Sequence, residues 1–203
     1  MTLEIKPATL DAVLADIWAR LVRGGADRRS AFHTPVVASI GADGIPQQRV
    51  MVLRKCVEAN ATMRFHTDLR SAKVREIGSG GPVSVLGYDA GAKIQIRASG
   101  HGLLSDTDEI ANAAWIASSP SSRRCYLTRY APGSVADKPM SGLPAALENR
   151  VPERSETEAG RVNFAVLTVR LDTLEWLYLA HDGQVRARFA HGEGGWKGEW
   201  LIP

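Results

Sequence analysis

The sequence predicts a mostly β protein with flanking helices, whose antiparallel strands close into a barrel. Three observations support this fold class. The chain contains about eight or nine strand-length runs of β-branched or alternating residues, turn signals separate several neighbouring runs, and only two or three segments have helical spacing. Antiparallel strands in this number usually remove their edges by closing on themselves, and a barrel is therefore expected.

Composition places the chain among ordinary soluble globular proteins. It has 203 residues, 44% hydrophobic and 23% charged, and we expect a single domain over residues 1–203. No apolar run approaches the roughly 18 residues that cross a bilayer, and Glu4 and Asp11 stand where a leader peptide would be basic and apolar. These features predict a cytoplasmic protein that is not bound to a membrane.

Cysteine and charge content exclude further classes. The two cysteines, Cys56 and Cys125, lie far apart and in no metal-ligand spacing, so neither a disulfide framework nor a metal site is expected. The net charge of +3 is too small for a nucleic-acid signature, and such a mild excess either serves a phosphate ligand or has no binding role. Aromatic residues make up only 6% of the chain, which also disfavours a barrel that binds single-stranded nucleic acid.

Residues 1–30 are predicted to form an amino-terminal helix and a linker. Apolar residues recur at helical spacing from Ala8 to Val22, and Thr9 provides a cap at the start. Gly24 and Gly25 are expected to end this helix.

The central part of the chain predicts a meander of hairpins. Turn residues 41–44 and 58–61 separate the first three runs, which favours antiparallel pairing of adjacent strands. The five runs expected to be strands here are Val36–Ile40, Gln48–Val57, Met63–Thr67, Val83–Tyr88 and Lys93–Leu104.

Two further helices and a long loop complete the prediction. Ser71 caps a short helix that reaches Ile77. A second helix runs from about Thr107 to Ser118 and is stopped by Pro120. Residues 132–161 are rich in Pro, Gly, Ser and Glu without a sustained period, which indicates a long loop or lid. The last four predicted strands are Phe164–Leu171, Glu175–Leu179, Gln184–Phe189 and Trp196–Leu201.

Basic residues in the first strands are the first candidates for binding. Arg49 and Arg54 flank an apolar run, and strand alternation points them to opposite faces unless a bulge intervenes. The alternative hypothesis is that both are surface arginines without a binding role. Lys73 lies in the first turn of its helix, where a cation is unfavourable without a nearby anion. A phosphate held by Ser71 and Lys73 would remove that conflict, whereas the alternative is a solvated lysine.

A polar stripe marks one face of the strand that follows. Lys93, Gln95 and Arg97 alternate with apolar neighbours. This pattern indicates either a solvent-exposed face or, at Gln95, an amide that forms hydrogen bonds with a heterocycle. Periodicity leaves both alternatives open.

Three of these segments, taken in order, carry a family pattern. The sequence resembles the pyridoxamine 5′-phosphate oxidase-like family of split β-barrels that bind flavin mononucleotide (FMN). The likeness covers residues 36–104 and resumes over residues 164–203. The motifs are Arg49-Val50-Met51-Val52-Leu53-Arg54, Phe65-His66-Thr67-Asp68-Leu69-Arg70-Ser71-Ala72-Lys73 and Gln95-Ile96-Arg97-Ala98-Ser99-Gly100.

The resemblance implies FMN bound in sites shared across a homodimer. Arg49 and Lys73 would hold the phosphate with Ser71 close by, and Gln95 would meet the flavin ring. Arg188 matches the family's flavin-contacting arginine, and either Tyr178 or Trp176 takes the place of its tryptophan. The full set of implied FMN contacts is Arg49, Val50, Met51, Val52, Leu53, Arg54, His66, Thr67, Ser71, Lys73, Gln95, Tyr178 and Arg188.

Departures from the family pattern concern the phosphate and the substrate. Ala72 stands where the family has a phosphate-binding arginine. One such arginine is therefore missing, unless Arg70 or Arg75 substitutes for it. Residues 115–120 lack the family's substrate-binding tyrosine and arginine, although Arg123 and Arg124 are candidates for binding another anion. The substrate is therefore expected to differ from that of the true oxidases.

Two functions follow as hypotheses. The first is an FMN-dependent oxidoreductase that acts on a small-molecule substrate or electron donor, with Arg54 near the flavin and His66 in a packing role. The second is a non-catalytic carrier of a flavin, F420 or a haem-related group. The sequence identifies no catalytic acid or base.

Overall fold

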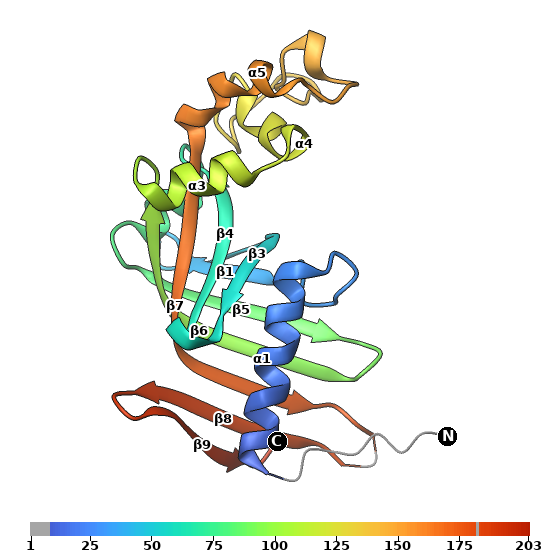
Figure 1. The fold of residues 1–203 in the computed structure, drawn as a ribbon, viewed down its shortest axis with the longest axis vertical. Helices are drawn as coiled ribbons and strands as arrows, with labels where there is room; N and C mark the ends of the chain where they lie inside the picture. Colours follow the sequence, from blue (N-terminus) through green and yellow to red (C-terminus); the bar gives the residue numbers. More distant parts are fainter. Residues whose placement is uncertain (1–8, 182) are drawn as a thin grey trace.

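A computed structural model describes residues 9–181 and 183–203 (Figure 1). In these residues, nine strands form one antiparallel sheet and helices lie around it. The strands are β1 (Val36–Ile40), β2 (Pro46–Val50), β3 (Leu53–Val57), β4 (Thr62–Asp68), β5 (Pro82–Asp89), β6 (Ile94–Ser105), β7 (Phe164–Tyr178), β8 (Val185–Gly192) and β9 (Gly195–Leu201). The α-helices are α1 (Leu10–Ala26), α2 (Ala72–Ile77), α3 (Glu109–Ala117), α4 (Pro120–Arg123) and α5 (Arg154–Thr157).

The sheet order explains why the strands close into a barrel. Seven strands follow the order β2-β1-β5-β6-β7-β4-β3, and β8 pairs with β7 and β9. The two strands that end this path, β2 and β3, are joined by Met51 and Val52 alone, so the sheet must curve until its edges approach. The Met51 N–H donates to the Pro35 carbonyl at 3.0 Å and fixes this bend. The predicted mostly β barrel with flanking helices is confirmed.

Local pairing agrees with the predicted hairpins, but the meander is wrong. β1–β2, β3–β4 and β5–β6 each pair as antiparallel neighbours. However, β1 pairs with β5 and β4 pairs with β7, because the bend at Met51–Val52 carries the β3–β4 hairpin to the other side of the barrel. The predicted strand Gln48–Val57 is therefore two strands.

One long strand connects the two parts of the sheet. β7 pairs with β6 along one edge, and along the other edge it pairs first with β4 and then with β8. The two predicted strands at residues 164–171 and 175–179 are parts of this one strand. The register with β6 shifts between Ser99 and Gly100, and the bulge there breaks the alternation from which two strands were inferred.

Helix α1 covers one side of the barrel (Figure 1). Thr9 caps it as predicted, since its hydroxyl accepts from the Ala12 N–H at 3.2 Å; the predicted first residue, Ala8, lies outside the described residues. The predicted end is wrong because the helix continues through Gly24 and Gly25 to Ala26. A Cβ on Gly24 would lie 2.7 Å from the Phe32 carbonyl oxygen, so this glycine permits close packing rather than ending the helix.

Helices α3 to α5 gather at the end of the molecule opposite β8 and β9 (Figure 1). Helix α3 begins after Asp108, close to the predicted start near Thr107, and the Asp108 carboxylate accepts from the Ala111 N–H at 2.9 Å. Pro120 follows α3 but also starts α4. The segment 132–161 contains short helical turns, among them α5 and a 3₁₀ turn at Ala145–Leu147.

Buried side chains lie mainly inside the barrel. The largest cluster is formed by α1 and the inward faces of the strands, and it includes Ile17, Trp18, Leu53, Met63, Phe65, Ile96, Leu171 and Trp176. A second, smaller cluster under α3 consists of Trp115, Tyr126, Phe164 and Val166. In the described ranges, no helix is both long and apolar enough to cross a membrane.

Candidate functional site

Four predicted residues form a cluster where β4 meets α2. The Lys73 Nζ donates to the Ser71 hydroxyl at 3.1 Å and to the Thr67 hydroxyl at 3.3 Å. Burial, and next the charge of Arg49, lowers the pKa of Lys73. We call Arg49, Thr67, Ser71 and Lys73 the cation cluster. Among the described residues, no carboxylate lies within ion-pair distance of Lys73, and the charges of Asp68 and Glu76 act on it from farther away.

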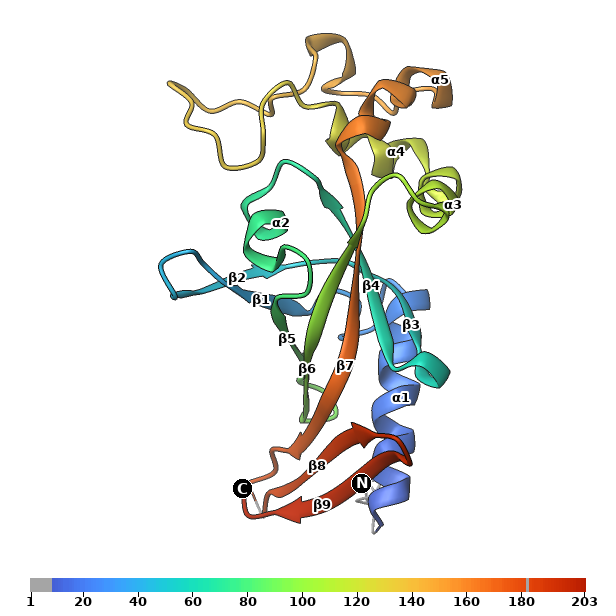
Figure 2. The ribbon, with the colours of Figure 1, turned by 90° about the vertical axis from the view of Figure 1, so that its left-hand side faces the viewer.

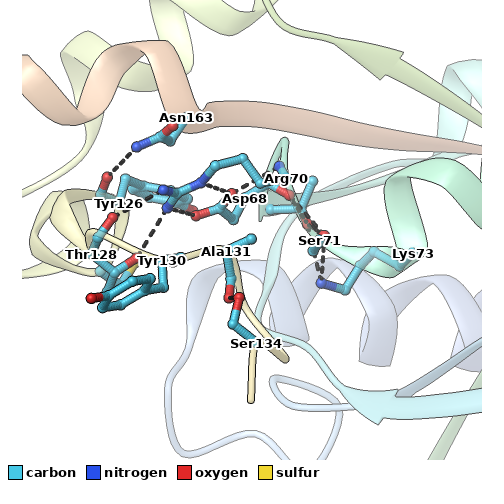
Figure 3. Close-up of polar contacts among 12 residues, drawn as sticks. Asp68, Arg70, Ser71, Lys73, Tyr126, Thr128, Tyr130, Ala131, Ser134 and Asn163 are labelled. Atoms are coloured by element: carbon cyan, nitrogen blue, oxygen red, sulfur yellow. Dashed lines mark hydrogen bonds and ion pairs between the residues drawn. The ribbon is translucent and has the colours of Figure 1, made fainter. Parts of the chain in front are cut away.

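Ser71 stands at the amino-terminal end of α2 but does not cap it with its side chain. The Ser71 hydroxyl donates instead to the Asp68 carbonyl at 2.7 Å, which turns its oxygen toward Lys73 (Figure 3). Ser71 and Thr67 are both buried, with 3% and 4% of their surfaces exposed. Two buried hydroxyls and an ammonium thus converge on one point at the end of β4.

Arg49 is held by two residues that the sequence analysis missed. Its Nη1 donates to the Ser39 hydroxyl at 2.5 Å, and its Nη2 donates to Glu76 Oε2 at 2.7 Å. Burial opposes ionisation of Glu76, but the hydrogen bonds from Ser39 and Arg49 outweigh it and lower the pKa of this carboxyl. The two positive charges of Arg49 and Lys73 exceed the one negative charge of Glu76, so the cluster carries an excess of positive charge.

The available sequence signal for these two residues was weak. Ser39 is a single hydroxyl inside an apolar strand, and Glu76 lies one helical turn after Lys73. Only the packing of α2 beside the β1–β2 hairpin brings them to Arg49 (Figure 2).

A second part of the site is a cleft of about 770 Å³ between α3 and the outer face of β3 and β4. A bulge between Leu53 and Lys55 leaves both Arg54 and Lys55 exposed on this side. Arg49 therefore belongs to the cluster and Arg54 to the cleft. The residues that line the cleft are Arg54, Lys55, Arg64, His66, Glu109, Ile110, Ala113, Ala114, Ala117, Ser118, Ser119, Ser122 and Val166.

His66 and Thr67 connect the two parts, because successive residues of β4 point to opposite faces. His66 lines the cleft, whereas Thr67 belongs to the cluster. The His66 ring packs edge-on against Phe164 with centroids 4.9 Å apart. Burial, aided by the charge of Arg54, lowers the pKa of His66 to about 4, so the imidazole is neutral at pH 7.

Side chains of the predicted flavin-binding strand point in different directions. Met51 and Leu53 are buried in the barrel core, and Val50 is 64% exposed. Val52 is half-buried. The Met51 N–H donates to the Pro35 carbonyl at 3.0 Å and the Leu53 N–H to the His33 carbonyl at 2.8 Å, so the side chains and N–H groups of both residues are already engaged within the protein.

The remaining predicted contacts lie on other strands. Gln95 is half-buried on β6 opposite Leu177, and Arg188 on β8 forms an ion pair with Glu199 at 2.6 Å. β8 lies at the end of the molecule opposite α3 to α5 (Figure 1). Trp176 is fully buried and donates to Asp16 at 3.0 Å, so Tyr178, which is half-buried, is the better candidate of the two for contact with a ligand.

Arg70 does not replace the phosphate-binding arginine that the family pattern has at Ala72. Its guanidinium pairs with the Asp68 carboxylate at 2.7 Å and donates to the carbonyl and hydroxyl of Thr128 at 2.9 and 3.0 Å. Figure 3 shows Arg70 directed toward Thr128 and Lys73 directed toward Ser71. Arg75 is exposed and donates to the Arg70 carbonyl at 3.3 Å.

The suggestion that Arg123 binds an anion is wrong. Arg123 is 1% exposed, donates twice to the Trp115 carbonyl, at 2.7 and 3.0 Å, and pairs with Glu158 at 2.6 Å. Its guanidinium carbon also lies 4.4 Å from the centre of a Trp115 ring. Arg124 donates to the Arg150 carbonyl at 2.7 Å. Both side chains thus connect segments at the end of the molecule that contains α3 to α5.

Comparisons with known proteins agree with this architecture. Residues 15–106 match the family described as pyridoxamine 5′-phosphate oxidase, FMN-binding domain. No curated protein matches the chain.

Two solved structures have a similar fold. One is a pyridoxamine 5′-phosphate oxidase-related, FMN-binding protein from Nostoc punctiforme PCC 73102, with 22% identity, all of both chains covered and a TM-score of 0.69. The other is PhzG from Burkholderia lata 383 in complex with tetrahydrophenazine-1-carboxylic acid, with 18% identity, 96% of this chain and 90% of that chain covered and a TM-score of 0.62. By its sequence match over residues 15–106 and by its fold, the chain is similar to the pyridoxamine 5′-phosphate oxidase-like split barrels.

Proposed function

We propose that the protein binds FMN through its cation cluster and acts as a flavin-dependent oxidoreductase. The observation that carries this proposal is the pair of half-buried cations, Arg49 and Lys73, which lie beside buried hydroxyls. In the described residues, Glu76 pairs with Arg49, but no carboxylate pairs directly with Lys73. A phosphate accepts charge-assisted hydrogen bonds from such donors and neutralises both cations. The residues present therefore fit the phosphate of FMN.

The cleft beside the cluster suits the flavin ring and a small substrate. Its volume of about 770 Å³ lies within the usual range for cofactor and ligand sites. Bound FMN would supply the electron-transfer chemistry. Arg54 would stabilise negative charge that develops in the cleft, and the neutral His66 would pack against the ligand without acting as a general acid at pH 7.

Gln95, Tyr178 and Arg188 are assigned to the same function through a homodimer. Arg188 lies on β8, away from the helical end that borders the cleft (Figure 1). A second copy of the chain would allow these residues to complete the flavin site of the partner. The proposal is thus a dimer in which each FMN is bound by both subunits.

The substrate is expected to differ from pyridoxamine 5′-phosphate. Trp115 replaces the tyrosine of the family pattern, is buried and donates its indole N–H to Glu158 at 3.2 Å. Arg123, the nearest downstream arginine, is likewise engaged. A second phosphate would therefore find few of the donors that a dianion requires after it leaves water.

A non-catalytic flavin carrier is the second candidate. It is favoured by His66, the histidine that lines the described cleft, because its pKa is lowered to about 4 and it is therefore not poised to exchange protons near pH 7. The two functions share the FMN site and differ only in turnover.

Anaerobic reduction of the FMN-loaded protein separates them. We expect reduction by NADH, NADPH or an organic donor, followed by repeated turnover when oxygen or another acceptor is added. Tight FMN binding without turnover over a broad panel of donors would favour the carrier. A protein that retains no FMN would refute both functions.

A further inference from the structure

Ser39, Arg49 and Glu76 form a closed triangle of hydrogen bonds beside the cation cluster. The Ser39 hydroxyl accepts from Arg49 at 2.5 Å and donates to Glu76 Oε2 at 2.5 Å, while Arg49 donates to the same carboxylate oxygen at 2.7 Å. Ser39 is 1% exposed, and the side chain of Glu76 is 11% exposed. The three residues come from β1, β2 and α2, so the triangle depends on the tertiary fold.

A carboxylate next to a phosphate site is unfavourable by charge alone, because it repels the ligand. Glu76 nevertheless helps to fix the orientation of the Arg49 guanidinium. Hydrogen bonds to Ser39 and Glu76 engage two of the five N–H groups of Arg49, which leaves three for a ligand. A guanidinium that is already fixed loses less side-chain entropy when the ligand binds.

We propose that Glu76, assisted by Ser39, is a positioning residue that holds Arg49 in the orientation needed to bind the phosphate of the flavin. This inference rests on the proposed function. Glu76 does not touch the ligand in this account and acts through Arg49.

Glu76 also affects the second cation. The charged groups near Lys73 are Arg49 on β2, Asp68 at the end of β4 and Glu76 on α2, and its hydrogen-bond partners are the two hydroxyls of the cluster. Burial and Arg49 lower the pKa of Lys73, whereas Asp68 and Glu76 oppose that shift. Loss of the Glu76 charge therefore lets Lys73 lose its proton at a lower pH.

The first test compares FMN with riboflavin, which lacks the phosphate, by flavin-fluorescence titration at pH 7. Glu76→Ala is expected to weaken FMN binding about tenfold, close to the value of one charge-assisted hydrogen bond, and to leave riboflavin binding unchanged. Glu76→Gln keeps an oxygen that accepts from Arg49 and is expected to retain FMN affinity within about threefold. Glu193→Gln removes the same charge from the exposed β8–β9 turn and serves as the matched control.

A double-mutant cycle tests whether Glu76 acts through Arg49. In an Arg49→Ala background, Glu76→Ala is expected to cause no further loss of FMN affinity. Additive losses would overturn the proposal, as would an equal loss for riboflavin.

The pH profile provides a measurement that does not depend on the Ala variant folding. The alkaline fall in FMN affinity should begin at a lower pH in Glu76→Gln than in the parent, and riboflavin titrated over the same range corrects for ionisation of the flavin ring. If the pH dependence of FMN affinity is the same in Glu76→Gln and in the parent, Glu76 does not affect the proton affinity of Lys73. If the parent binds FMN no better than riboflavin, the proposed function fails as well; if it prefers FMN but the Glu76 variants match it, only this inference fails.

Discussion

Replacement of Lys73 by methionine is expected to separate FMN binding from folding stability. The variant keeps most of the apolar stem and removes an ammonium group that contacts two hydroxyls but, in the described residues, no carboxylate. Since no ion pair is broken, the free protein should unfold at the same or a higher temperature than the parent.

The expected loss of FMN affinity follows from the contact that is removed. A charge-assisted hydrogen bond to phosphate contributes about 1.5 to 3 kcal/mol, which corresponds to a roughly tenfold to hundredfold weaker Kd. Arg49→Ala should cost at least as much, because it also leaves the ionised Glu76 and the Ser39 hydroxyl without their shared partner.

Fluorescence titration with FMN and with riboflavin, together with thermal unfolding without flavin, measures both effects. Riboflavin affinity should be nearly unchanged in Lys73→Met. A role of Lys73 in binding the phosphate is excluded if FMN binds to Lys73→Met as it does to the parent, or if riboflavin loses as much affinity as FMN.

Four further predictions concern pH, packing, assembly and specificity. The pKa of His66 is lowered from 6.5 to about 4 in the fold, so as the pH falls the unfolded chain takes up a proton before the folded chain does. Between pH 6.5 and pH 4 the free energy of unfolding of the parent should therefore fall by roughly 3 kcal/mol more than that of His66→Phe, as measured by urea titration. Gly100→Ala should destabilise the fold by more than about 2 kcal/mol, because a Cβ there would lie 1.9 Å from the Arg170 carbonyl oxygen; normal urea unfolding of this variant would contradict the packing. Sedimentation at micromolar concentration should show a homodimer, and a stable FMN-loaded monomer would contradict the shared site. FMN-loaded protein should form little pyridoxal 5′-phosphate from pyridoxamine 5′-phosphate and oxygen, whereas turnover in the usual enzyme range of about 1 to 1000 per second would show that the changes around Trp115 were misinterpreted.

Local features of the fold were accessible from the sequence because they depend on neighbouring residues. Alternation located most strands, and β1 has the predicted bounds. Pairing between distant strands was not accessible, since the bend at Met51–Val52 decides it. Gly24 and Gly25 resemble a helix end in sequence, but their role is to let α1 approach residues that come later in the chain.

The candidate site was only partly visible for the same reason. Thr67, Ser71 and Lys73 lie within seven residues and form one cluster. Ser39 and Glu76 are 37 residues apart, and Arg123 and Glu158 are 35 apart. Such partners are brought together by tertiary packing alone, so periodicity neither finds Glu76 nor shows that Arg123 is already engaged.

The absorbance spectrum of the purified protein after incubation with FMN and desalting is the direct test of whether this chain binds FMN. We expect flavin bands to remain with the protein in an amount equimolar to the chain, and riboflavin treated in the same way to be largely removed. A protein that elutes without flavin bands after incubation with FMN would contradict this expectation.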